Sequence, residues 1–433
     1  MGENERMTNL VSGAAAVFVF LLSFYHITGM GNFILAQRGS IVPWHLWALS
    51  IAGCGLLAIF SGYSHRLPKA SLPYLLWCAG FILVCIFSLL FVNRGWRAVE
   101  TMTAYGWFFS VSVSLLILVR TPSLVRACGY GAAAAVVVMS VLTIMEFLDP
   151  NFQVIVDRLF VDQNVVGTVN RAGAFHINPN NNGSAIALGM VCGVLFVPRY
   201  LRLPFILLAG FAIFGTVSRS SLTLWALATL YFFFAGLVFK GQIAGKILGV
   251  ILIGGLGALL VTGQIPVIVD SIGMDRLLSD NMRDRLSSGF FTQQDTSTFA
   301  RLEAAEGAFV AFVNNPVLGI GLGATDVVEG VGVGSHNQHL KTAAEMGIIG
   351  FLLYVALMVV AVKSGSMLAI VFVALYFING LADHGLLYGI QYAVLIPLGV
   401  VFIPELIKVT PVKKRRRKRR RKTSSFAEKQ LSA

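Results

Sequence analysis

The sequence predicts an all-α, polytopic membrane protein with about twelve transmembrane helices and a large helical loop outside the membrane. The first observation behind this prediction is composition, because the 433 residues are 56% hydrophobic and only 12% charged. A soluble domain is usually about 25% charged, so this chain has too little polar surface to cover a globule. The second observation is the recurrence of apolar segments close to the roughly 20 residues that cross a bilayer.

Twelve apolar segments are the predicted spans. They lie near residues 8–28, 44–62, 71–92, 99–119, 127–148, 183–198, 203–218, 221–239, 247–263, 348–362, 367–381 and 386–407. An even number of spans places both termini on one side of the membrane. The loops that share this side are short and basic, which is the pattern of cytoplasmic loops. We therefore expect a bacterial inner-membrane protein with cytoplasmic termini and a periplasmic active site.

This topology divides the chain into four parts. Residues 1–263 hold nine spans and a shorter periplasmic loop near 149–182, residues 264–347 form the large periplasmic loop, residues 348–407 hold three spans, and residues 408–433 form a polybasic tail. Ten of the 33 lysines and arginines lie in the run Lys413–Lys422. Such a run favours attraction to anionic lipid head groups. A nucleic-acid signal is the alternative reading, and we expect membrane lipids as the partner and no nucleic acid.

Neither a metal ion nor another cofactor is predicted. The five cysteines lie inside or beside apolar segments and form no CxxC motif, so neither a zinc site nor a disulfide framework is indicated. The predicted periplasmic loops contain no DxD, HExxH or GxSxG motif. This pattern disfavours metal-dependent chemistry and a serine nucleophile.

The predicted periplasmic loops are rich in arginine, and Lys341 is their only lysine. Arginine makes planar, bidentate contacts with phosphate and carboxylate groups. Arginines in the cluster 276–285 can pair with aspartates of the same loop, which is the structural alternative to binding. These aspartates are Asp270, Asp275, Asp280, Asp284 and Asp295. Arg171, Arg219 and Arg301 lie among apolar or small neighbours instead, which favours a role in binding an anion.

A polar cluster at the end of the large loop, Ser335-His336-Asn337-Gln338-His339, predicts the start of a helix. Ser335 and Gln338 have the spacing of a capping box, so we expect a helix that begins at His336 and ends near Gly347. In the first turn the helix dipole disfavours imidazolium and keeps the ring of His336 neutral, as a general base requires. The structural alternative is a histidine that only caps or packs.

Three further pieces have a defined place in the predicted topology. Arg219 lies between two spans at the outer membrane boundary, where it is a functional candidate or a snorkelling anchor. Arg301 lies on a predicted helix over 297–313, and the glycines of 319–323 that follow are interpreted as a tight turn, since no strand or acidic partner supports a nucleotide site. Asn178-Pro179-Asn180 either caps a span or forms one wall of a polar site.

In their order, sidedness and spacing these pieces resemble the O-antigen ligase and polymerase superfamily. The matching residues are Asn178-Pro179-Asn180, Ser218-Arg219, Arg301 leading into Asn315-Pro316-Val317-Leu318-Gly319-Ile320-Gly321, and His336-Asn337 followed by Leu340, Glu345, Gly347 and Gly350. The resemblance covers roughly residues 170–360 by motif, and the remainder by topology.

The resemblance implies a glycosyltransferase that acts outside the inner membrane on glycans carried by undecaprenyl diphosphate. It implies that His336 is the base and that Arg219 and Arg301 hold the diphosphate, with Arg171 as a further candidate. His339 and Asn180 are secondary candidates. An acceptor hydroxyl would attack the anomeric carbon without a metal ion, and the configuration would invert.

Several acceptors fit this chemistry. We expect transfer of O-antigen to lipid A–core, because an arginine-rich periplasmic loop suits a phosphorylated acceptor. O-antigen polymerisation and transfer to a protein hydroxyl are the alternatives. The alternative of a different class is a lipid-linked glycan transporter or flippase, which predicts charged residues at mid-bilayer depth and broken helices in matching halves. The main in-span acidic residues, Glu100 and Glu146, lie near span ends instead.

Overall fold

The structure of the chain is a computed structural model. It describes residues 3–31, 44–60, 67–68, 71–149, 152, 154, 171–176, 178–239, 243–271, 283, 287, 296–326, 336–383, 385–387 and 389–409. Every regular element within these residues is helical. The predicted all-α class is therefore confirmed. Ser335 and the basic run of the tail lie outside the described residues.

The helices follow one another along the chain. They are α1 (Glu3–Thr28), α3 (Trp44–Phe60), α4 (Ser71–Phe91), α5 (Trp96–Leu118), α6 (Pro122–Leu148), α8 (Pro179–Gly193), η1 (Arg199–Leu201), α9 (Arg202–Gly215), α10 (Arg219–Phe234), α11 (Ile243–Thr262), α12 (Ile265–Ser271), α14 (Thr296–Asn314), η3 (Ala324–Asp326), α15 (Gln338–Lys363), α16 (Met367–Gly380), α17 (Tyr392–Pro397), the π-helical η4 (Leu398–Phe402) and α18 (Ile403–Val409).

Each of the twelve predicted spans overlaps one of these helices or a run of them. Among the described residues, 5 helices are long and apolar enough to cross a membrane, namely residues Asn9–Thr28 of α1 together with α4, α5, α6 and α15. Ala48–Phe60 of α3 and the whole of α16 are shorter apolar helices. These lengths support a multi-pass membrane protein. Twelve crossings and the orientation in the membrane stay predictions.

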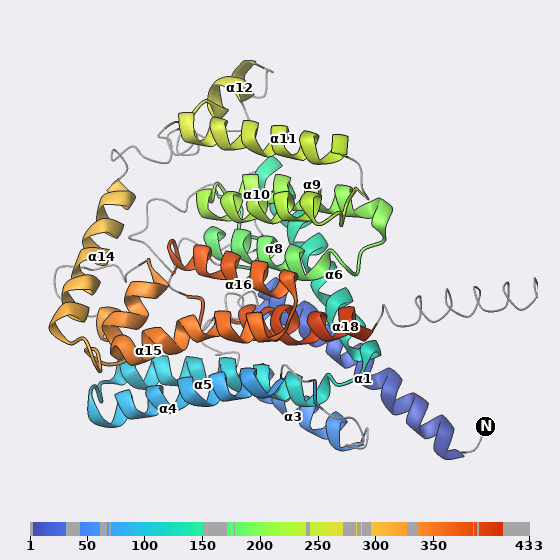
Figure 1. The fold of residues 1–433 in the computed structure, drawn as a ribbon, viewed down its shortest axis with the longest axis vertical. Helices are drawn as coiled ribbons and strands as arrows, with labels where there is room; N and C mark the ends of the chain where they lie inside the picture. Colours follow the sequence, from blue (N-terminus) through green and yellow to red (C-terminus); the bar gives the residue numbers. More distant parts are fainter. Residues whose placement is uncertain are drawn as a thin grey trace, which may run out of the picture.

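The long helices run side by side, and α14 lies across one end of them, beside the start of α15 (Figure 1). α1 begins and α18 ends at the opposite end of this bundle (Figure 1). α6 packs against α1, α8 and α9. Its buried side chains include Ala132 and Ala135, and small residues let neighbouring helices approach closely.

Both faces of the long helices are apolar. On α4, Trp77 and Phe81 are buried, whereas Leu76 and Leu83 are 64% and 65% exposed. A helix that is hydrophobic all round belongs in a protein core or in lipid. Since these leucines point away from the core, their natural solvent is the bilayer.

α15 is broken at Gly347, which has φ 64° and ψ −165°. A Cβ at this position would also lie 2.2 Å from the carbonyl oxygen of Val317, so only glycine fits. The break divides α15 into a first part, residues 338–346, and a second part, residues 348–363. The predicted end of a helix near Gly347 is confirmed, and a second helix follows it directly.

Candidate functional site

The starts of α8 and α10 form one side of the candidate site. Asn178 caps α8 and accepts a hydrogen bond from the Asn180 N–H at 2.9 Å. Ser218 caps α10 and accepts from the Ser221 N–H at 3.5 Å. The capping interpretation of the asparagine stretch is confirmed. Arg219 is the first residue of α10 and is partly exposed, so it lies at a helix end whose N–H groups and dipole also favour an anion.

Arg171 is buried, with 7% of its surface exposed. Its Nε donates to the carbonyl oxygen of Thr216 at 2.8 Å, and its Nη2 donates to Oδ1 of Asn180 at 2.7 Å. The side chain therefore joins the start of α8 to the turn before α10, where Val217 has a φ of 52°. The sequence predicted Arg171 and Asn180 as binding residues, and the structure pairs them with each other.

Glu146, in the last turn of α6, binds Val154 and the backbone just after Arg171. Its Oε2 accepts from the N–H groups of Gly173 and Ala174 at 2.8 Å each, and its Oε1 accepts from that of Val154 at 2.8 Å. The sequence marked Glu146 only as an acidic residue near a span end. These bonds make it an anchor of Val154 and of the backbone just after Arg171.

α14 carries Arg301 along the end of the bundle. The helix Thr296–Asn314 agrees with the prediction over 297–313. Its buried face is formed by Ala304 and Ala308, whereas Leu302 and Phe309 are 60% and 54% exposed. α14 packs against α15. Small side chains on the buried face therefore bring the backbone that carries Arg301 close to the helix that follows His336.

The start of α15 differs from the prediction. The helix begins at Gln338, and Asn337 is its cap, because Oδ1 of Asn337 accepts from the Leu340 N–H at 3.1 Å. A start at His336 is therefore wrong, and His336 lies just outside the helix rather than in its first turn. Gln338 is buried, and its Oε1 accepts from the Leu386 N–H at 3.2 Å. This contact draws Gln338 away from the capping box that the sequence predicted.

His336 is partly exposed and lies within electrostatic reach of Arg301. Burial, and after it the positive charge of Arg301, lower the pKa of His336 from 6.5 to about 4. The imidazole is therefore neutral at pH 7, as a general base must be. The neutral ring agrees with the prediction, but its causes are burial and Arg301 instead of the helix dipole.

His339 has a packing role in the structure. Its Nε2 donates to the carbonyl oxygen of Phe377 at 2.9 Å, and its ring meets those of Tyr354 and Phe377 edge to face. A ring nitrogen that donates to a backbone carbonyl fixes the tautomer and the orientation of the imidazole. His339 is thus tied to the end of α16, although it is partly exposed, as His336 is.

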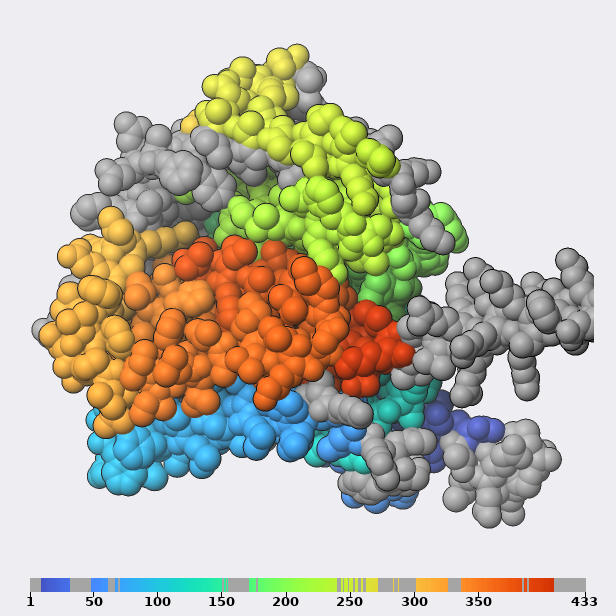
Figure 2. Space-filling model, in the orientation of Figure 1, coloured from blue at the N-terminus to red at the C-terminus, as the bar shows by residue number. Residues whose placement is uncertain are grey.

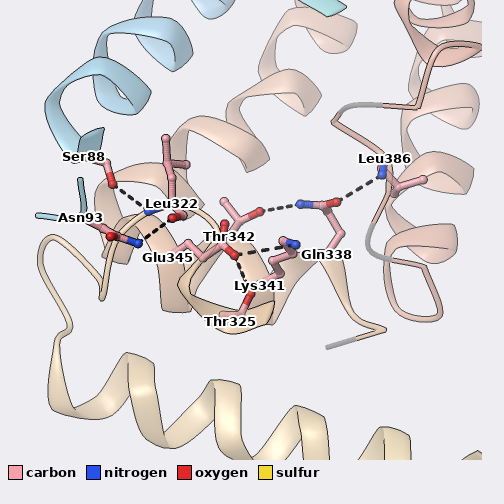
Figure 3. Close-up of polar contacts among 9 residues, drawn as sticks. All are labelled: Ser88, Asn93, Leu322, Thr325, Gln338, Lys341, Thr342, Glu345 and Leu386. Carbon is pink, nitrogen blue, oxygen red and sulfur yellow. Dashed lines mark hydrogen bonds and ion pairs between the residues drawn. The ribbon is translucent and has the colours of Figure 1, made fainter. Parts of the chain in front are cut away.

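A polar network holds the first part of α15 on both flanks (Figure 3). On one flank the Gln338 N–H donates to the carbonyl oxygen of Asp383 at 3.0 Å, and Nε2 of Gln338 donates to Oγ1 of Thr342 at 3.0 Å. On the other flank the buried Glu345 accepts from Oγ1 of Thr325, and Nζ of Lys341 lies 3.7 Å from its Oε1. Buried charges are stable only when they are paired.

Sequence reasoning missed this network. Its signals in the sequence were weak: Lys341 was noted only as the single lysine of the outer loops, and Glu345 only as part of a motif. The contacts Gln338–Thr342 and Lys341–Glu345 follow helical spacing. The other partners, Asp383, Leu386 and Thr325, come from other segments of the chain, so helical spacing alone could not identify them.

The glycine-rich stretch before η3 forms the tight turn that the sequence predicted. The N–H groups of Ile320 and Gly321 donate to the carbonyl oxygens of Ala344 and Glu345 at 2.8 and 3.0 Å. These are carbonyls at the end of the first part of α15, which the break at Gly347 leaves without helical partners. The turn therefore caps this part of the helix.

α16 links the two sides of the site. Asn379 is buried, and its Oδ1 accepts from Oγ of Ser184 in α8 at 2.9 Å. Ser184 and Ser221 of α10 lie 3.3 Å apart, oxygen to oxygen. The starts of α8 and α10, which carry Asn180 and Arg219, are thereby joined to the α16 end that also receives His339. The structure thus places Arg171, Asn180 and Arg219 at the starts of α8 and α10, on one side of the α16 end. Arg301 and His336 lie on the side of α15.

One arginine of the 276–285 cluster forms an ion pair with an aspartate, which is the structural alternative to binding an anion. Nη1 of Arg283 lies 2.8 Å from Oδ2 of Asp270. Within the described ranges, no group of three or more His, Cys, Asp and Glu side chains could hold a metal ion. Metal-independent chemistry stays a prediction.

Comparison with known proteins bears on the same region. Residues 204–355 match the family model described as O-antigen ligase, Wzy_C. Residues 204–355 are an O-antigen ligase family domain. No curated protein sequence matches the chain.

The O-antigen ligase domain runs from α9 into the second part of α15. It contains Arg219, Arg301, His336 and His339, whereas Arg171 and Asn180 precede it. A domain of this family implies a membrane enzyme of the glycosyltransferase type that uses lipid-linked glycans. Helices that precede the domain pack against it, since α8 packs against α10 and α4 packs against α15.

Proposed function

We propose that the protein transfers O-antigen polysaccharide from undecaprenyl diphosphate to a hydroxyl group of lipid A–core in the periplasm. The observation that carries this proposal is that His336 lies within electrostatic reach of Arg301, inside an O-antigen ligase domain. A neutral imidazole beside a guanidinium supplies a proton acceptor and an anion-binding group at one place. Those are the two functions that this transfer needs.

In the proposed reaction the acceptor oxygen attacks the anomeric carbon of the donor while His336 takes the hydroxyl proton. The bond between the anomeric carbon and the diphosphate oxygen breaks, and the diphosphate leaves with the electron pair. Arg219 and Arg301 bind the diphosphate, and the contacts that tighten as its charge grows accelerate the reaction. A single displacement inverts the configuration. No metal ion takes part in this scheme.

The geometry gives Arg171 and His339 supporting roles in the proposal. Arg171 is buried and bonded to Asn180 and Thr216, so it holds the helix start that presents Arg219. His339 is bonded to Phe377, so it holds the first part of α15 against α16. Both residues act through others, whereas Arg219, Arg301 and His336 are the proposed contacts with substrate.

The test combines a purified system with a deletion strain. Purified protein in detergent, with lipid-linked polysaccharide and lipid A–core, should form polysaccharide-bearing lipid A–core without any ion gradient. A requirement for a gradient would favour a transporter and contradict the proposal. A deletion strain should lose polymer on lipid A–core and accumulate lipid-linked polymer. Lipid A–core that carries a single repeat would identify a polymerase instead.

A further inference from the structure

The corner between α4 and α5 carries two positive charges, those of Arg94 and Arg97. Arg94 and Arg97 flank Trp96, which is 68% exposed. The Arg97 guanidinium lies 4.8 Å from the centre of the Trp96 ring. In the part of the chain that the structure describes, neither arginine forms an ion pair. An exposed tryptophan with arginines is typical of a membrane–water boundary.

An apolar groove of about 290 Å³ opens directly below this corner. Leu83, Val84 and Phe87 of α4 form one wall, and Leu318, Met346 and Ile349 are among the residues opposite. α4 and α15 lie side by side along this face of the molecule (Figure 2). A groove of this lining, on helices whose outer faces meet lipid, accepts a hydrocarbon chain.

Arg94 lies above the same face of α4. Leu83, Phe87 and Leu90 share one side of the helix at spacings of four and three residues, and Nε of Arg94 donates to the carbonyl oxygen of Leu90 at 2.8 Å. The guanidinium is therefore about one helical turn, roughly 5 Å, above the groove. A cation at that height over an apolar groove fits a phosphate group attached to a lipid chain.

The position of this corner decides which lipid it fits. Asn93 donates from Nδ2 to the carbonyl oxygen of Leu322 at 2.9 Å, and Gly321 donates to that of Glu345. The corner is thus at the Glu345 end of the first part of α15, while His336 precedes the other end. Nine helical residues separate the two ends by about 14 Å.

This separation excludes the reacting end of the donor. In a polyprenyl diphosphate sugar, the anomeric carbon is attached directly to the diphosphate, so the donor phosphates must lie at His336 itself. An acceptor differs, because its reacting hydroxyl lies on an oligosaccharide several sugars away from its lipid phosphates. Such a molecule can place its phosphates at the corner and still reach His336.

We propose that Arg94, Trp96 and Arg97, with the groove between α4 and α15, form the docking site for the phosphorylated lipid part of the acceptor. The acyl chain lies in the groove, and the phosphate is bound by the two arginines. This inference rests on the proposed function for the identity of the acceptor. The site itself can be tested without any transfer reaction.

The binding experiment uses purified protein and radiolabelled diphosphorylated lipid A in mixed micelles. The double variant Arg94→Gln/Arg97→Gln should weaken lipid A binding about tenfold or more, because it removes two charge-assisted contacts with phosphate. Arg126→Gln, an exposed arginine at the start of α6 at the far end of the bundle, is the control and should bind as the wild type does. His336→Ala should also bind lipid A normally, so a failure of the catalytic proposal leaves this test intact.

The groove is tested with a matched pair of substitutions on α4. Leu83→Trp fills the groove and should reduce lipid A binding. Leu76→Trp lies two turns away on the same side of α4, at 64% exposure against 65% for Leu83, and should have no effect. If both variants bind as the wild type does, the groove holds no lipid A chain.

Two further arms identify the source of the phosphate. Dephosphorylated lipid A should bind weakly to the wild type, and phosphatidylglycerol in equal amount should displace little diphosphorylated lipid A. Equal binding of the dephosphorylated form, or full displacement by phosphatidylglycerol, would overturn the proposal. In a transfer assay, Arg94→Gln/Arg97→Gln should raise KM for lipid A–core and leave KM for the donor unchanged. A change confined to the donor KM would also overturn it.

Discussion

At the residue scale, the protonation of His336 sets the pH range in which the proposed base can act. Burial and Arg301 hold its pKa at about 4 in the free protein. A bound diphosphate brings negative charge to the same place, which raises the pKa of His336 in the complex. We therefore expect the acid limb of kcat/KM near pH 4 and the acid limb of kcat at higher pH, since these two report free and bound enzyme. Rates measured from acidic to neutral pH check this, and a kcat/KM limb at 6.5 would contradict it.

Arg301 contributes to this low pKa, and its removal gives a second prediction. Arg301→Gln removes a positive charge beside His336, so the pKa of His336 should rise and the acid limb of kcat/KM should move to higher pH. Arg283→Gln, which breaks a surface ion pair with Asp270, is the control and should leave the limb in place. The pairing of Arg301 with His336 is refuted if both variants give the wild-type pH profile.

Arg219 offers a prediction about shape rather than charge. Arg219→Lys keeps the positive charge but loses the planar fork that binds two phosphate oxygens. We expect kcat/KM for the donor to fall by roughly tenfold or more. Arg283→Lys should change it little, because an exposed ion pair contributes at most about 1 kcal/mol. Wild-type activity in Arg219→Lys would return Arg219 to the role of an interfacial anchor.

At the element scale, the break in α15 presents the first part of the helix to the site. Gly347→Ala would place a Cβ 2.2 Å from the Val317 oxygen and force alanine into a region that only glycine occupies easily. We expect loss of activity together with a lower melting temperature. Gly365→Ala is the matched control, because Gly365 has a similar φ of 70° but open space around it. It should lower stability by about 1–2 kcal/mol and retain activity; equal behaviour of the two variants would contradict the role of the turn.

Helices α14 and α15 together explain what the sequence could and could not predict. The ends at Gly347 and at Asn314-Asn315-Pro316 were predictable, because glycine and proline act locally on the backbone. The start of α15 was not predictable, because both Ser335 and Asn337 are good caps. Contacts of Gln338 with Asp383 and Leu386, which lie some 45 residues further along the chain, favour Asn337.

At the scale of the whole molecule, apolar segments predicted the order of the helices, since lipid requires long apolar runs whatever the tertiary contacts are. The bonding of buried polar groups was not predictable in the same way. Arg171 was assigned to substrate because arginine suits phosphate, but its acceptors are the Asn180 side chain and the backbone of Thr216. Only the packing of α8 against α10 brings those acceptors to it.

The predicted topology can be tested across the whole chain. Reporter fusions at Gly289 and Val327 should read as periplasmic, and fusions near Gln242 and after Lys422 should read as cytoplasmic. The reason is that basic loops remain in the cytoplasm and one span separates Gln242 from Gly289. Identical readings at Gln242 and Gly289 would contradict the twelve-span arrangement.

Transfer by His336 and Arg301 is the central claim, and the most direct measurement compares two histidines in the purified transfer assay. His336→Ala should abolish transfer to lipid A–core while expression and membrane insertion stay normal. His339→Phe keeps the ring that packs against Tyr354 and loses the bond to Phe377, so it should retain substantial activity with a stability loss of about 1 kcal/mol. An active His336→Ala together with an inactive but folded His339→Phe would contradict the account and assign the base to His339.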